Sequence, residues 1–118
     1  MSRIPRKKSR PIVVDGKTFR WMLKGRSRYI GDTPRSLRLI VQEDEETPGR
    51  PLIIGLTSKH WTVDMTEGLE SHRASVIPSN VVQIVRTSLE SGWDPSEKGA
   101  PFIPALELEF EDFVCDVP

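Results

Sequence analysis

Apolar residues occupy every second position along several stretches of the chain, which is the period of a β-strand with one buried face. The alternation is clear in residues 17–24, 36–42 and 105–111. Residues 52–57 carry apolar side chains on both faces, which is typical of a strand in the centre of a sheet. Together with the β-rich residues 11–14, these stretches predict five strands.

Asp15 and Gly16 separate the first two predicted strands. This dipeptide favours a type I′ turn, because both central residues of that turn need a positive φ. In the second strand Phe19, Trp21 and Leu23 share the face that we expect to be buried. The two strands are therefore predicted to form a hairpin.

One helix is predicted over residues 79–91, because its apolar residues recur at helical spacing. The buried stripe is made of Val81, Ile84, Val85 and Leu89. Ser79 is the preferred N-cap, and Pro78 in the first helical position is the alternative. Gly92 suits the left-handed residue after the last turn, and Trp93 is expected to close the helix end as a structural anchor.

The order β-β-β-β-α-β predicts an α+β domain, with about five mainly antiparallel strands and one helix packed on one face of the sheet. We expect the domain to span residues 11–112, after a disordered basic arm over 1–10 and before a C-terminal tail over 113–118. The predicted core is Phe19, Trp21, Leu23, Leu37, Leu39, Val41, Leu52, Ile54, Leu56, Val81, Ile84, Val85, Leu89, Leu106, Leu108 and Phe110.

A single helix leaves the other face of the sheet uncovered, and that face mixes apolar and cationic residues, as protein interfaces do. The loop with His60 and Trp61 is expected at its rim. The candidates for binding a partner protein are Arg20, Met22, Lys24, Arg38, Ile40, His60 and Trp61. The alternative is an ordinary solvated face with scattered apolar residues.

The formal net charge is zero, but the charges are unevenly distributed. Residues 1–30 hold ten Lys or Arg and one acid, whereas residues 43–46 and the last eighteen residues are acidic. This layout predicts pairing between basic and acidic strands within the molecule, and a nucleic-acid-binding segment is the alternative. The candidates for that alternative are Arg3, Arg6, Lys7, Lys8, Arg10, Arg26, Arg28 and Tyr29. No established nucleic-acid-binding motif accompanies them.

Catalytic chemistry has little support in the sequence, so we expect a protein that is not an enzyme and holds no cofactor or metal. His60, Asp64, His72 and Cys115 match no familiar metal spacing, and surface histidines are the favoured interpretation. The outward glutamates of residues 105–111 are typical of a solvated strand face. A small hydrolase that uses the loop between the two histidines is the third functional hypothesis, after protein binding and nucleic-acid binding.

Cys115 is the only cysteine, so no internal disulfide forms, and a reducing cytoplasmic setting is expected. No run of apolar residues reaches the length of a membrane span, so no membrane association is expected. The sequence leaves the oligomeric state and the identity of the partner open.

Three short motifs resemble those of a group of small uncharacterised bacterial proteins. They are Phe19-Arg20-Trp21, Gly92-Trp93-Asp94-Pro95 and Gly99-Ala100-Pro101-Phe102. The resemblance covers most of residues 11–110, and its motifs are structural: a hairpin, a helix stop and a strand entry. It implies a bacterial cytoplasmic source and carries over no activity and no functional residue.

Overall fold

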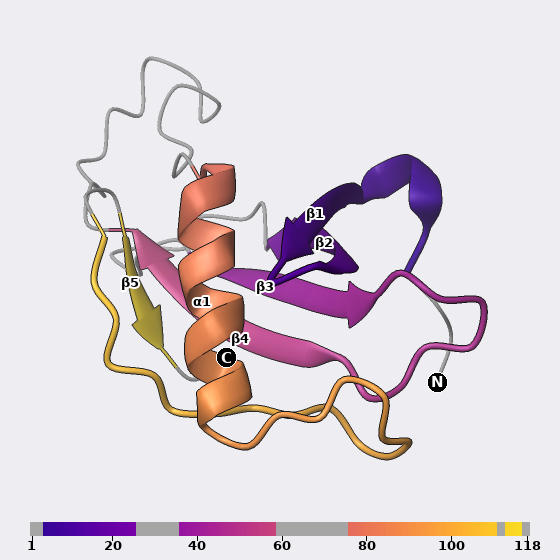
Figure 1. Ribbon diagram of the computed structural model, residues 1–118. Coiled ribbons are helices and arrows are strands. Elements are labelled where there is room, and N and C mark those ends of the chain that lie inside the picture. Colours follow the sequence, from indigo (N-terminus) through magenta and orange to yellow (C-terminus); the bar gives the residue numbers. More distant parts are fainter. Residues whose placement is uncertain (1–3, 26–35, 59–75, 111–112, 117–118) are drawn as a thin grey trace.

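The protein is described by a computed structural model that covers residues 4–25, 36–58, 76–110 and 113–116. Five strands form one antiparallel sheet in the order β1-β2-β3-β4-β5, and one helix runs across one face of it (Figure 1). The elements are η1 (Arg6–Lys8), β1 (Arg10–Val14), β2 (Lys17–Gly25), β3 (Ser36–Glu43), β4 (Leu52–Ser58), α1 (Pro78–Glu90) and β5 (Phe113–Asp116). The predicted α+β class and element order are confirmed.

The β1–β2 hairpin forms as the sequence predicts. Asp15 has φ 51° and Gly16 has φ 84°, and Val14 pairs with Lys17 across the two-residue turn. These positive φ values are those of a type I′ turn, which Asp-Gly favours. The turn fixes the register, so Phe19 and Trp21 point to the same face as Ile12 of β1.

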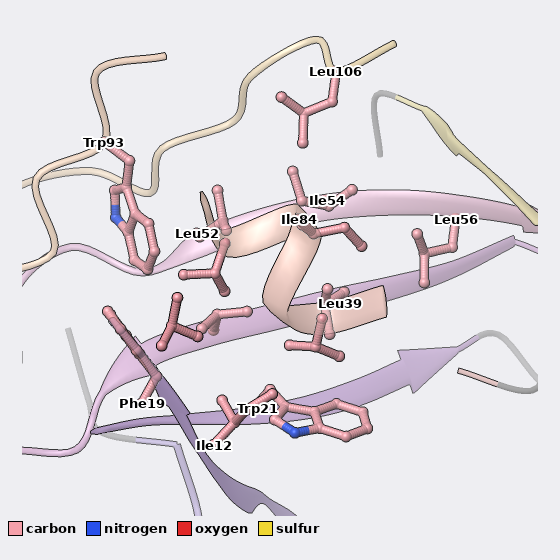
Figure 2. Close-up of a cluster of buried hydrophobic side chains, with 14 of the residues drawn as sticks. Ile12, Phe19, Trp21, Leu39, Leu52, Ile54, Leu56, Ile84, Trp93 and Leu106 are labelled. Atoms are coloured by element: carbon pink, nitrogen blue, oxygen red, sulfur yellow. The ribbon is translucent and has the colours of Figure 1, made fainter. Parts of the chain in front are cut away.

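The core lies between α1 and the sheet, where side chains from β1, β2, β3, β4 and α1 converge (Figure 2). Phe19 and Trp21 are buried, which confirms the predicted face of β2. The buried apolar residues are Ile12, Val14, Phe19, Trp21, Leu39, Val41, Leu52, Ile54, Leu56, Val81, Ile84, Val85, Trp93, Leu106 and Phe113. The predicted core residues Leu23, Leu89, Leu108 and Phe110 are half-buried against this cluster, and the side chain of Leu37 lies outside the described residues.

The helix begins one residue earlier than its preferred prediction. Pro78 takes the first helical position, so the alternative start is the correct one and Ser79 lies inside the first turn. Asn80 Oδ1 accepts a hydrogen bond from the backbone N–H of Ile77 at 3.3 Å. This bond satisfies a backbone donor just before the helix, where Pro78 itself has none to offer.

The C-terminal end of α1 is closed by Gly92 and Trp93, as predicted. Gly92 has φ 112°, its N–H bonds to the carbonyl of Leu89, and the N–H of Trp93 bonds to the carbonyl of Ser88. This is the pair of bonds that ends many helices at a left-handed glycine. Trp93 is 3% exposed, its ring centroid lies 5.7 Å from that of Phe19, and its Nε1 donates to the carbonyl of Arg50.

The last strand lies elsewhere than predicted. The strand expected over 105–111 is wrong, because residues 105–110 form no strand and meet β5 only through a bridge from Glu109 to Val114 and the backbone hydrogen bonds beside it. The sheet instead takes Phe113–Asp116, within the predicted tail, as β5, which pairs with β4. Phe113 is fully buried, so the domain includes residues beyond 112. The alternating Leu106, Leu108 and Phe110 pack against the core, and the segment meets β5 of the sheet through this short contact without forming a strand.

Residues 4–9, which we call the N-terminal segment, differ from the expected disordered arm. They contain the short turn η1, and Ser9 is buried against the sheet. The segment has almost no apolar surface to bury, which was the basis of the expectation. Hydrogen bonds with Arg20 of β2 and Gln42 of β3 hold it instead.

Candidate functional site

The face of the sheet opposite α1 carries the residues that the sequence predicts as partner-binding candidates. Side chains alternate along a strand, so the neighbours of the buried residues of β2 and β3 point away from the helix. We call this surface the open face. It contains Arg20, Met22 and Lys24 of β2, Arg38, Ile40 and Gln42 of β3, and Ile53 and Thr57 of β4. The two other candidates, His60 and Trp61, lie outside the described residues.

The centre of the open face is an apolar row. Met22 pairs with Ile40, and Ile40 pairs with Ile53, so three aliphatic side chains lie side by side on three neighbouring strands. Each is half-buried. In the described part of the chain, α1 covers the opposite face of the sheet. The N-terminal segment is hydrogen-bonded to the open face at one end only.

The N-terminal segment occupies the end of the open face near Arg20 and Gln42. Arg20 Nε donates to Ser9 Oγ at 2.8 Å, and Arg20 Nη2 donates to the carbonyls of Ser9 and Arg6 at 2.8 and 3.1 Å. Gln42 Oε1 accepts from the N–H of Ile4 at 2.9 Å, and this side chain is 1% exposed. Arg20 and Gln42 therefore bind the protein's own chain.

Asp44 completes this contact. Its Oδ1 lies 2.9 Å from Arg6 Nη1, and its Oδ2 lies 3.9 Å from Arg20 Nη1. Two of the basic residues in the first thirty positions thus meet one member of the acidic run, as the intramolecular interpretation of the charge layout expects.

The opposite end of the open face carries two cations. Lys24 lies directly across from Arg38 in the β2–β3 register, and both side chains are exposed. Like charges directly opposite one another on a sheet repel. No carboxylate in residues 4–25, 36–58, 76–110 or 113–116 forms an ion pair with either.

On the helix side of the sheet, Glu43 is a buried carboxylate with three partners. Its Oε1 accepts from the N–H of Gly49 at 3.0 Å, while Oε2 accepts from Ser96 Oγ and meets Lys17 Nζ, both at 3.1 Å. A Cβ at Gly49 would overlap the carbonyl oxygen of Pro95. Glu43 therefore joins two loops that are distant in the sequence, a role that its place in an acidic run did not indicate.

The structure gives little support for chemistry at the described residues. Burial raises the pKa of the Cys115 thiol to about 11, so the thiol stays protonated at neutral pH and is a poor nucleophile. No group of three His, Cys, Asp or Glu in the described part of the chain is arranged to hold a metal ion. His60, Asp64 and His72, on which the metal and hydrolase hypotheses depend, lie outside the described residues.

The nucleic-acid candidates are only partly described. Lys7, Lys8 and Arg10 are exposed, whereas Arg6 is paired with Asp44. Trp21 is 5% exposed in the core and has no accessible face on which a base could stack. Arg3, Arg26, Arg28 and Tyr29 lie outside the described residues.

In comparisons with known proteins, no family model, no curated protein and no solved structure matches the chain. Within the described residues, no helix has the length and apolar character to cross a bilayer.

Proposed function

We propose that the protein is a binding module without catalytic activity, and that it binds another polypeptide through the open face. The observation that carries this proposal is the aliphatic row of Met22, Ile40 and Ile53, flanked on the same face by Lys24 and Arg38. An apolar centre with a charged border is the usual anatomy of a protein interface. The free Cys115 and the resemblance to small bacterial proteins support a reducing, bacterial cytoplasmic setting.

The chemistry of the row favours a polypeptide over a nucleic acid. Proteins that bind single strands stack bases on aromatic side chains, and the described residues of the open face include none. Aliphatic side chains instead match the apolar side chains of a protein partner. Nucleic-acid binding remains the second candidate, because Lys7, Lys8 and Arg10 are exposed near one end of the sheet.

An affinity capture from native lysate, with and without nuclease, tests this function. The tagged protein is compared with the double variant Met22→Glu/Ile40→Glu, which puts two charges into the apolar row, and with Gln83→Glu on the exposed side of α1 as a control. We expect nuclease-resistant protein partners that the control keeps and the double variant loses. Capture that disappears with nuclease, or that the double variant keeps, contradicts the proposal.

A further inference from the structure

The cationic end of the open face differs from the sites where charged residues of the described fold are paired. Lys17 meets Glu43, Arg20 meets Asp44, and Arg86 of α1 meets Asp15 of the hairpin turn. Lys24 and Arg38 face each other instead. Their mutual repulsion opposes folding, and a glutamate at either position would turn it into an attraction. Nothing in the described packing requires two cations there, since both side chains are exposed.

The cations lie next to the aliphatic row in a fixed geometry. Lys24 follows Met22 by two residues along β2, and Arg38 precedes Ile40 by two residues along β3. Two residues of a strand span about 6.8 Å, so the two rows are separated by that distance along the strands. An extended polypeptide that lies along β2 and β3 presents alternate side chains to the face at the same spacing.

We propose that the partner at the open face is an acidic polypeptide segment, with its carboxylates on Lys24 and Arg38 and an aliphatic side chain two residues away on Met22 and Ile40. This inference rests on the proposed function and adds the chemistry of the partner. Binding would supply the negative charge that the described part of the fold does not place beside these cations. A nucleic-acid backbone has no apolar group that could pack against Met22, Ile40 and Ile53. We therefore favour carboxylates over phosphates as the source of that charge.

Three labelled peptides of equal length, with repeats of Glu-Thr-Val-Thr, Gln-Thr-Val-Thr or Lys-Thr-Val-Thr, serve as probes in anisotropy titrations. We expect the glutamate peptide to bind at least about tenfold more tightly than the glutamine peptide at low salt, and the lysine peptide not to bind. The advantage of the glutamate peptide should shrink as salt is added, because exposed charges are screened.

Lys24→Glu separates binding from folding. This variant replaces the repulsive cross-strand pair with an attractive one, so its unfolding midpoint should equal or exceed that of the parent. Its affinity for the glutamate peptide should nevertheless fall by about tenfold or more. The double variant Lys24→Glu/Arg38→Glu should prefer the lysine peptide. Lys7→Glu/Lys8→Glu makes the same charge change in η1, away from these rows, and should leave all three peptide affinities unchanged.

The possible results separate this inference from the function on which it rests. Equal binding of the glutamate and glutamine peptides, unaffected by Lys24→Glu but lost in Met22→Glu/Ile40→Glu, overturns the acidic partner and leaves polypeptide binding intact. If none of the three peptides binds, and Met22→Glu/Ile40→Glu captures the same partners as the parent, the proposed function is overturned as well. Binding of an oligo-dT strand that depends on Lys24 and Arg38, without peptide binding, also overturns the inference and makes nucleic acid the occupant.

Discussion

Glu43 is a single buried side chain that we expect to contribute strongly to the stability of the fold. Its carboxylate accepts bonds from Gly49 and Ser96 and meets Lys17, and the residue is 6% exposed. Glu43→Ala leaves the Gly49 N–H without its acceptor, so we expect a loss of about 3 kcal/mol in the free energy of unfolding. Urea denaturation measures it. Glu46→Ala, in the same acidic run but exposed, should change stability by less than about 0.5 kcal/mol; equal effects of the two substitutions would contradict this role.

The role of Glu43 was not predictable from local pattern, whereas that of Phe19 was. Period-two alternation reports which side of a strand is buried, and it correctly placed Phe19, Trp21 and Leu39 in the core. The partners of Glu43 come from loops whose contact depends on the whole fold, with Ser96 53 residues further along the chain. Its neighbours in the acidic run are charged too, so nothing local distinguishes it.

At the scale of elements, the last strand was misplaced because a local sequence pattern does not show which segments pair with each other. Residues 105–111 alternate cleanly, and Leu106 is buried as expected, but of residues 105–110 only Glu109 forms a bridge to the sheet, to Val114 of β5, and no strand forms. Alternation reports a buried face and not a hydrogen-bonding partner. Phe113–Asp116 is short and begins with a buried phenylalanine, which the sequence pattern placed after the end of the domain. The helix stop was predictable, because Gly92 and Trp93 act within one turn of α1.

The end of α1 is joined to the rest of the fold by Trp93. Trp93→Ala removes a buried ring beside Phe19 and the bond to the Arg50 carbonyl, so we expect a loss of about 3–5 kcal/mol in the free energy of unfolding. Trp93→Phe keeps most of the ring and loses the bond, and should cost less than the alanine variant. An unchanged denaturation midpoint in Trp93→Ala would show that the ring is not packed and would make Trp93 a binding candidate.

Across the whole molecule, ion pairs within the fold account for part of the uneven distribution of charge along the chain. Three basic residues of the first part of the chain, Arg6, Lys17 and Arg20, pair with Asp44 or Glu43, and the one acid of that part, Asp15, pairs with Arg86 of α1. The sequence predicted this pairing but not the partners, because strand order is set by topology rather than by composition. On the open face, Lys24 and Arg38 are the described cations that form no ion pair within the described residues.

Arg20 makes more hydrogen bonds to the N-terminal segment than Gln42 or Asp44, because its guanidinium bonds to Ser9 Oγ and to two main-chain carbonyls. Arg20→Ala should release residues 4–9, since the segment has little apolar surface to hold it. Backbone amide heteronuclear NOEs should be strand-like for these residues in the parent and fall in the variant. Arg38→Ala, an exposed arginine on the same face, should leave them unchanged. Low NOEs for residues 4–9 in the parent would show that Arg20 does not hold the segment and that the whole open face is available to a partner.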